Sequence, residues 1–218
     1  MTAPTLDRAA LAEMPIFPLP RIVFFPGTLL PLHVFESRYR TMLAESLRTH
    51  RAMIIVRTRA DGAKNAAGAP AIESIAGAGV IVEHELLADG RSNLVLVGVA
   101  RVKLDELPFV EPYRRARSTV LSPVPTHVPD GERAALVAAA TSFVNEIRRR
   151  DASFDFPFPD GADAATVADA CAAHLVVDAD SRQAALEELD EAKRVRLVTR
   201  ELMVQDAAFR GNDKRVLH

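Results

Sequence analysis

The stretch Leu19-Pro-Arg-Ile-Val-Phe-Phe-Pro-Gly-Thr-Leu-Leu-Pro-Leu-His-Val-Phe-Glu-Ser-Arg-Tyr39 sets the pattern for the first half of the chain. Short apolar runs alternate in it with prolines, and Pro26-Gly27 is a typical turn pair. Because proline has no N–H group to give to a central ladder, we expect the strands around it to lie at sheet edges or to bend sharply. The apolar residues that follow Val34 recur at helical spacing, so a helix should begin near Ser37.

On either side of this stretch, residues 1–121 alternate between apolar and polar with a period of two, which is typical of strands. About seven short strands and one helix could close a small barrel. Strands are expected within residues 16–19, 22–25, 53–56, 80–87, 93–99, 101–107 and 114–121, with an extended segment over residues 29–34. Ala88-Asp89-Gly90 is a hairpin signal, and the Ala- and Gly-rich segment Arg57 to Gly79 should be a mobile loop.

After the proline-rich segment Ser122 to Pro129 the periodicity becomes helical. An apolar stripe runs from Leu136 to Ile147, and we expect the two halves to fold as one unit that packs through it. Helix boundaries are expected at caps Asp130, Asp163 and Asp190, at a capping box Asp180-Ser-Arg-Gln183, and at Gly211. The predicted parts are a β-rich part with one helix over residues 1–122, a connector over 123–130 and a helical bundle over 131–218.

Composition excludes several classes of partner. The 218 residues carry a formal charge of -2, which gives no attraction toward nucleic acid or anionic lipid. The short basic runs, which include Arg114, Arg115 and Arg117, are expected to be solvated faces. No targeting segment is recognisable, and the longest buried-looking run is too short to span a bilayer. With its lone Cys171, the chain is expected to be cytoplasmic, without disulfide or membrane contact.

The obvious catalytic motifs are missing. No lysine follows a glycine, as a P-loop requires, and no serine has the flanking glycines of a nucleophile elbow. His84-Glu85 begins like a zinc-protease motif but lacks the second histidine, and the six histidines have no ligand spacing. The sequence therefore predicts no catalytic residue, no metal site and no cofactor.

The opening stretch resembles the amino-terminal, substrate-binding domain of Lon proteases. His33-Val-Phe-Glu-Ser-Arg-Tyr-Arg40 is close to the pattern of short bacterial proteins that consist of this domain alone, without the ATPase and protease modules. The likeness continues through the strands after Gly77 and through Ala168 to Leu175 and Gln183 to Asp190, so it covers residues 14–209. It implies an α+β fold, a PUA-like β pseudo-barrel followed by a C-terminal helical bundle, similar also to the Lon-like domain of cereblon. The motif residues expected to be structural are Pro26, Gly27, Pro31, His33, Glu36, Arg38 and Gly77, with Glu36 and Arg38 holding the strand-to-helix elbow by capping and pairing.

The resemblance implies a non-catalytic module that binds protein or peptide segments, either as a reader of unfolded or flexible segments or as a protease adaptor. Aromatic side chains near prolines make rigid anchors, because they bury area with few rotors to freeze. The candidate anchors are Phe35, Tyr39, Phe109 and Tyr113, and the alternative is that they fill the seam between barrel and bundle. An RNA-binding PUA-like module is the alternative function, although the chain lacks the basic stripe that RNA binding needs. The identity of the partner, the oligomeric state, action with a Lon protease in trans and the role of the Arg57–Gly79 loop stay open.

Overall fold

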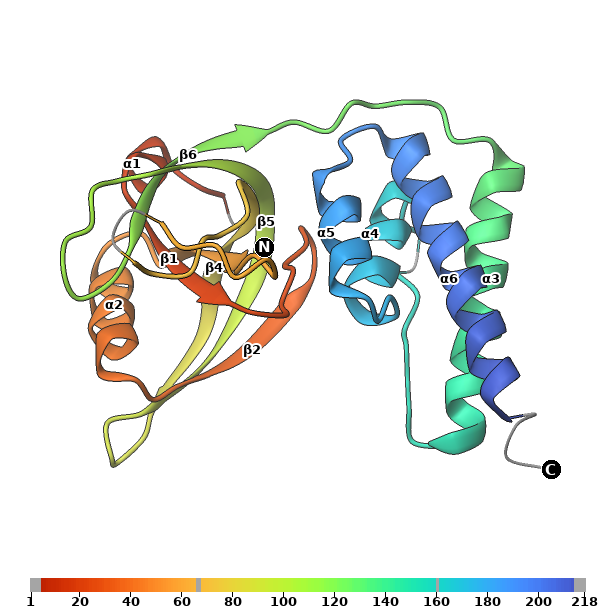
Figure 1. The fold of residues 1–218 in the computed structure, drawn as a ribbon, viewed down its shortest axis with the longest axis horizontal. Coiled ribbons are helices and arrows are strands. Elements are labelled where there is room, and N and C mark those ends of the chain that lie inside the picture. Colours follow the sequence, from red (N-terminus) through yellow and green to blue (C-terminus); the bar gives the residue numbers. More distant parts are fainter. Residues whose placement is uncertain (1–4, 66–67, 160, 214–218) are drawn as a thin grey trace. The chain divides into compact units, whose positions relative to one another are not determined.

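The computed structural model describes residues 5–65, 68–159 and 161–213. The chain divides into two compact units, Met1–Leu121 and Ser122–His218 (Figure 1). Each unit has its own secondary structure and its own buried side chains, and each is described here by itself.

The first unit is a small barrel, whose described residues form six strands and two helices. Its elements are α1 (Arg8–Ala12), β1 (Met14–Leu19), β2 (Leu29–Val34), α2 (Ser37–Arg48), β3 (Ala52–Arg57), β4 (Ile75–Leu86), β5 (Ser92–Glu106) and β6 (Arg115–Leu121). The strands are hydrogen-bonded in the order β2-β5-β4-β3-β1-β6, and β5 also pairs with β6. Five strands therefore close a ring, and β2 is an additional strand on β5. With the helical second unit, this confirms the predicted α+β fold of a β pseudo-barrel and a C-terminal bundle.

Strand β5 organises the barrel, because it changes partner along its length. Residues 92–97 pair with β2 and residues 101–106 pair with β6. The change occurs around Gly98, whose carbonyl accepts from the Gly27 amide at 2.9 Å and whose amide donates to the Thr28 carbonyl at 2.9 Å. Gly27 has a φ of +76°, so the predicted Pro26-Gly27 turn is confirmed. The prediction of two separate strands over 93–99 and 101–107 is wrong, because β5 is continuous.

The apolar run Ile22–Phe25 is buried from Val23 to Phe25, but the prediction that it is a strand is wrong. The run crosses the sheet at two glycines. A Cβ at Gly77 would overlap the backbone of Phe24, and a Cβ at Gly98 would overlap the backbone of Phe25. The two glycines thus let a second layer of backbone lie directly on the sheet, where it makes no ladder of its own.

Gly77 lies within β4, which begins at Ile75, so the loop predicted over Arg57–Gly79 is shorter than expected. The described ends of the remaining segment lie against each other. The Arg59 amide donates to the Ala71 carbonyl at 2.8 Å, and the Arg57 guanidinium lies 3.1 Å from the Glu73 carboxylate. These bonds close the two ends of the loop against each other.

Strand β1 is not at an edge, contrary to the expectation from its prolines. It runs parallel to β3 along residues 16–19 and pairs with β6 only through Met14 and Pro15. The Ile16 amide donates to the Arg114 carbonyl at 2.9 Å. The backbone N–H and C=O groups of residues 14, 16 and 18 therefore face the side of β6. Pro18 therefore lies where β6 has already diverged and no donor is required.

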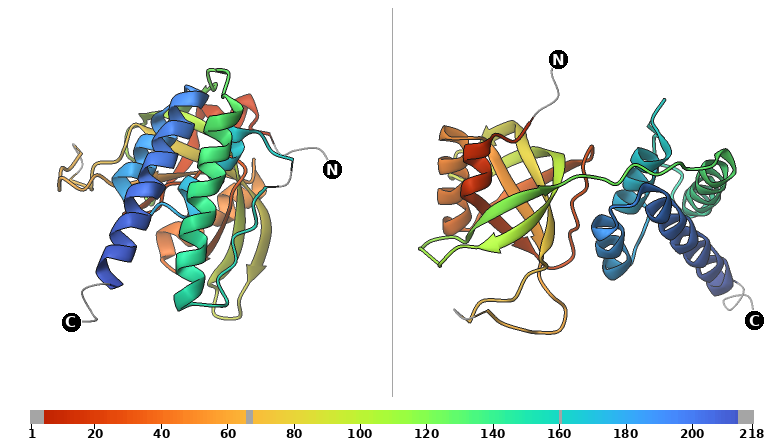
Figure 2. Two further views of the ribbon diagram at one scale, coloured as in Figure 1. Left: turned by 90° about the vertical axis from the view of Figure 1, so that its right-hand side faces the viewer. Right: turned by 90° about the horizontal axis from the view of Figure 1, so that it is seen from above.

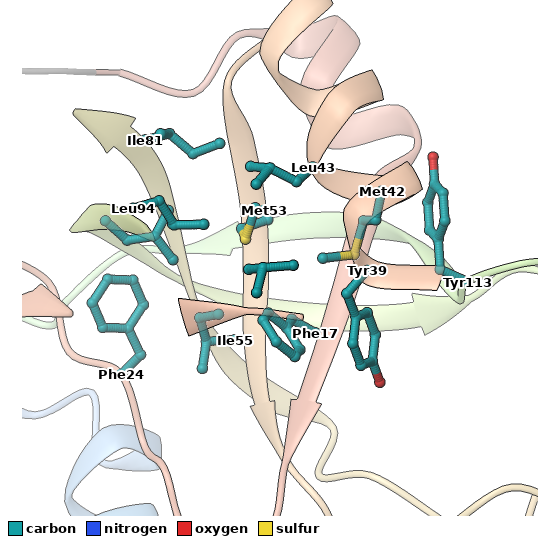
Figure 3. Close-up of a cluster of buried hydrophobic side chains, with 12 residues drawn as sticks. Phe17, Phe24, Tyr39, Met42, Leu43, Met53, Ile55, Ile81, Leu94 and Tyr113 are labelled. Atoms are coloured by element: carbon teal, nitrogen blue, oxygen red, sulfur yellow. The ribbon is translucent and has the colours of Figure 1, made fainter. Parts of the chain in front are cut away.

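The core of the barrel has two clusters of apolar side chains, which lie on opposite faces of β3. All six residues of β3 are buried. Met53 and Ile55 face the cluster under α2, which Figure 3 shows in close-up. Ile54 and Val56 face the second cluster, which is rich in alanine. Burial of both faces accounts for the continuous apolar run of this strand.

The second unit has four helices among its described residues: α3 (Asp130–Arg150), α4 (Ala164–His174), α5 (Ala179–Glu187) and α6 (Glu191–Asp213). Helices α3 and α6 lie side by side (Figure 2) and run in the same direction. Arg196 of α6 lies 3.1 Å from Glu132 of α3, and further along Ser142 donates to Asp206 at 2.9 Å. The predicted stripe of α3 is buried at Leu136, Ala140, Phe143 and Val144.

The helix caps agree with the sequence in part. Asp163 caps α4 by accepting from the Thr166 amide at 2.7 Å, and Asp190 accepts from the Lys193 amide at 2.9 Å at the start of α6. Three predictions are wrong. Asp130 is the first residue of α3 and follows Pro129 at the cap position; α5 is capped by Asp178 rather than by a box at Asp180; and α6 continues through Gly211.

Two features hold the second unit together. The fully buried Arg194 of α6 pairs with Asp169 of α4 at 3.0 Å and donates to the Glu188 carbonyl at 2.7 Å. The proline-rich segment after residue 121 is also attached, because the Thr126 hydroxyl donates to Asp190 at 2.9 Å. Within residues 5–65, 68–159 and 161–213, every helix is too short or too polar to span a lipid bilayer.

Candidate functional site

Three of the four candidate anchors line one cavity in the first unit. Tyr39, Phe109 and Tyr113 surround a space of about 240 Å³ together with residues of β1 and of the loop before β4. Tyr39 comes from the first turn of α2, and the other two come from the segment between β5 and β6. The fourth, Phe35, does not belong to this cavity.

Two buried tyrosines form the inner part of the pocket. The side chains of Tyr39 and Tyr113 are only 6% and 4% exposed. The Tyr39 ring packs on Phe17 with 4.3 Å between ring centroids, and Figure 3 shows the two tyrosine hydroxyls pointing in opposite directions. Burial raises the pKa of the Tyr39 hydroxyl, so this group is neutral at physiological pH. Both rings belong to the core as well as to the pocket.

A polar network holds Tyr113 in place. Its hydroxyl donates to Glu45 of α2, and Arg115 donates to both partners, at 2.9 Å to the hydroxyl and 3.1 Å to the carboxylate. Burial, followed by the hydrogen bond to Glu45, raises the pKa of Tyr113. The same hydrogen bond is the main cause of the lowered pKa of Glu45. The network therefore ties the loop before β6 to α2 with the tyrosine neutral and the carboxylate charged.

The outer part of the pocket is apolar and open. Phe109 is 50% exposed, and Pro70 and Pro112 are exposed beside it. Arg114 holds one side of the pocket in place. Its guanidinium forms a bidentate ion pair with Glu106 at 2.6 and 2.7 Å, and it also donates to the Pro70 carbonyl at 2.9 Å. Because this arginine is buried, the expectation that Arg114 lies on a solvated face is wrong.

Arg38 stands at the rim, over the Tyr39 ring at 4.6 Å from its centroid. Its guanidinium is paired with Glu36 at 2.8 Å. The predicted pairing of these two motif residues is therefore present, but Glu36 makes no side-chain cap bond to α2. Both charges in the described lining, Arg38 and Arg114, thus have a carboxylate partner.

Three further motif residues, Pro31, His33 and Phe35, are exposed along β2 and the residue that follows it. Phe35 is 61% exposed and stacks on His33 with 6.2 Å between ring centroids. His33 contacts Asn93 of β5 at 2.8 Å. Pro31 lies in the same strand, opposite Val95. The segment His33–Tyr39 thus contributes to two surfaces, with Arg38 and Tyr39 at the pocket and His33 and Phe35 outside it.

The pocket lining combines aromatic side chains and prolines with two paired arginines. Its described lining residues include no carboxylate, imidazole or thiol, and the described part of the chain contains no cluster of three potential metal ligands. In the other unit, burial raises the pKa of the Cys171 thiol to about 12, so this thiol stays protonated at physiological pH. The cavity is smaller than the roughly 300–1,000 Å³ of typical small-molecule sites. It has room for one or two side chains of another molecule.

Sequence reasoning did not find Ile16, Pro70, Pro112 and Arg114 as lining residues. The burial of Arg114 could have been predicted, because it lies two and four residues before Ala116 and Ser118, the buried residues of β6. Alternate residues of a strand face the same side. The two prolines belong to loops whose course depends on hydrogen bonds to distant residues.

Comparison with known proteins gives a consistent result. The family model described as the ATP-dependent protease La (LON) substrate-binding domain matches residues 13–204. The Lon protease of Desulfosudis oleivorans is 24% identical over 207 residues, which cover 92% of this chain and 25% of that protein. The Lon protease of Anaeromyxobacter dehalogenans is 26% identical over 191 residues, covering 86% and 22%. The chain spans about a quarter of the length of the curated relatives it matches.

Solved structures show the same fold. The Lon N-terminal domain protein from Xanthomonas campestris superposes with a TM-score of 0.63 at 20% identity, covering 85% of this chain and 95% of that chain. The N-terminal domain of the Mycobacterium avium complex Lon protease gives 0.61 at 14% identity, covering 87% and 97%.

Proposed function

Because this chain belongs to the family of Lon substrate-binding domains, we propose that it binds segments of other proteins and performs no covalent chemistry on them. The observation that carries the proposal is the meeting of Tyr39, Phe109 and Tyr113 in one cavity. Handing the bound segment to a separate protease, as an adaptor does, is part of the proposal.

The pocket has the physical character of an anchor site. A buried aromatic base and an exposed aromatic rim allow an apolar side chain to lose water on several sides at once. The paired arginines leave no isolated charge for the ligand to neutralise. Ordering a flexible segment costs conformational entropy, so we expect weak binding, roughly micromolar or about 8 kcal/mol.

Phe109→Ala is the test of this pocket, because the side chain is half exposed and its loss should leave the barrel folded. Fluorescence anisotropy with a labelled, permanently unfolded protein should show affinity reduced by about 1 to 2 kcal/mol. Phe35→Ala is the matched control, since it removes the same side chain from an exposed position outside the pocket. A loss of affinity in Phe35→Ala with normal binding in Phe109→Ala would contradict the assignment.

A single-stranded RNA belongs in the same assay as a competitor. The formal charge of -2 provides little counterion release on RNA binding. RNA should therefore leave the anisotropy of the bound protein probe unchanged. Displacement of the probe by RNA at physiological salt would favour the RNA-binding alternative instead.

A further inference from the structure

The far half of β4 has an open edge. Residues 77–80 of β4 lie between β3 and β5, but β3 pairs no further than Val80. From residue 82 onward, β4 is exposed and pairs with β5 alone among the described residues. The side chains of Val82 and Leu86 in this part of the strand are 46% and 69% exposed.

The hairpin shows which backbone groups face this edge. The Leu87 amide donates to the Arg91 carbonyl at 2.9 Å, so residues 87 and 91 form a hydrogen-bonded pair. In an antiparallel ladder such pairs alternate with non-bonded ones. Glu85 therefore directs its N–H and C=O toward Asn93 of β5, while His84 and Leu86 direct theirs outward.

Strand β3 does not extend beside residues 82–86 of β4, because the chain changes direction at the residue before β3. Arg51, directly before β3, has a φ of +52° and turns the chain away from β4. Its carbonyl accepts from the Ile81 amide at 2.7 Å, and its side chain donates to the Ile81 carbonyl at 3.3 Å. Ile81 is thereby satisfied, and the next outward groups along the strand belong to His84 and Leu86. A partner strand would occupy the path that β3 vacates.

The opposite edge of this three-stranded ribbon is protected. The Gly98 amide donates to the Thr28 carbonyl. In this register the backbone N–H and C=O groups of residues 30, 32 and 34 of β2 face β5, and those of residues 29, 31 and 33 face outward. Pro31 therefore has no N–H at the centre of the outward row. Proline is a common means of blocking an edge strand, and no such block is present at β4.

The charges beside the β4 edge select the partner. Glu83 and Glu85 are exposed and lie on either side of His84. Two copies of this chain paired through their β4 edges, with His84 at the two-fold axis, would place Glu83 against Glu85, and like charges opposite each other destabilise a ladder. A strand with lysine or arginine at alternate positions meets the same carboxylates favourably. The nearby cations Arg91 and Arg51 are already engaged, Arg91 with Asp89 at 2.6 Å and Arg51 with the Ile81 carbonyl.

We propose that the edge formed by residues 82–86 binds an extended segment of another protein that carries Lys or Arg at alternate positions. The segment adds a strand to β4 through the main-chain groups of His84 and Leu86, as in β-augmentation. Glu83 and Glu85 provide the charge selection. This site does not depend on the pocket of Tyr39, Phe109 and Tyr113.

Hydrogen exchange of the full chain, with a peptide of alternating Thr and Lys as the probe, tests the contact. The amides of His84 and Leu86 should exchange more slowly with the peptide bound, while that of Glu85, already bonded to β5, should not change. A peptide with Glu in place of Lys should give no protection, and added salt should weaken the effect. Equal protection by both peptides, or protection confined to other segments, would overturn the proposal.

Substitution separates the backbone contact from the side chain. His84→Pro removes an outward N–H without removing a bond to β5, and should reduce affinity about tenfold. His84→Thr keeps the N–H and should bind as the original chain does. Equal binding by the Pro and Thr variants would refute the main-chain contact. If His84→Pro does not melt like the original chain, Leu86→Pro serves instead, and the exchange measurement on the unsubstituted chain decides by itself.

Discussion

Gly98→Ala should destabilise the barrel by about 3 to 5 kcal/mol. A Cβ at this position would lie well inside 3.0 Å of the Phe25 carbonyl oxygen, 2.9 Å from its carbonyl carbon and 3.2 Å from the Cα of Pro26. All three atoms are backbone, so no change of rotamer relieves the overlap, and the crossing segment must move away from β5.

The magnitude follows from what that movement breaks. The hydrogen bonds from Gly27 to Gly98 and from Gly98 to Thr28, each 2.9 Å long, join the crossing segment to β5. Losing both costs about 1 kcal/mol each, and overpacking adds about 1 to 3 kcal/mol. Gly98 has no positive φ, so the cost comes from the overlap and from the lost hydrogen bonds.

Urea unfolding followed by tyrosine fluorescence is the suitable assay. The chain has two tyrosines and no tryptophan, and Tyr39 and Tyr113 both belong to the first unit, so the signal reports on the barrel. Gly131→Ala is the control, because a Cβ there meets nothing within 4 Å and the residue is in the first turn of α3. That change should leave the tyrosine transition where it is and stabilise α3 by about 0.5 to 1 kcal/mol. A loss below about 1 kcal/mol in Gly98→Ala would refute the reasoning, because such a value falls within ordinary surface substitutions.

Three further predictions concern charged and reactive groups. Asp169→Asn leaves Arg194 buried without its carboxylate and should lower the stability of the second unit by about 3 to 5 kcal/mol in helical circular dichroism, with a smaller loss when Arg194→Met is added. Glu45 has a folded pKa below its usual 4.5, so its contribution is present above that pH and is lost as the pH falls through the folded pKa. Tyr113→Phe should therefore flatten the acid limb of a stability-against-pH curve, and an unchanged limb would contradict the role of this hydrogen bond. Cys171, with its thiol pKa raised by burial to about 12, should resist iodoacetamide at pH 8 until the second unit unfolds, and rapid labelling of the folded chain would show that it is accessible.

The sequence predicts those elements whose signal is local. The helix after Ser37 begins where its apolar spacing starts, and Asp163 caps α4 because its cap bond reaches only three residues ahead. The fold class also follows, since the change of period near residue 122 separates strands from helices.

What the sequence does not predict depends on contacts distant along the chain. The run Ile22–Phe25 has the composition of a strand, and only the glycines of β4 and β5 make it a crossing layer instead. In the same way Arg114 belongs to a basic run, yet it is buried because Glu106 and the Pro70 carbonyl satisfy its guanidinium. Three of the four aromatic residues singled out in the sequence line one pocket, but the loops that shape this pocket could not be predicted, because loop paths are decided by such long-range bonds.

The two partnerships of β5 also bear on the order of folding. Its pairing with β4 closes through the short turn Leu87–Arg91, and its pairing with β6 begins at Glu106 and Ala116, whereas β2 must arrive from a position 60 residues away at the contact of His33 with Asn93. Loop closure is fastest for the nearest strands, so a meander of β4, β5 and β6 should assemble first and receive β2 afterwards. Substitutions in the β4–β5 hairpin should then slow refolding, while substitutions confined to β2 should mainly speed unfolding.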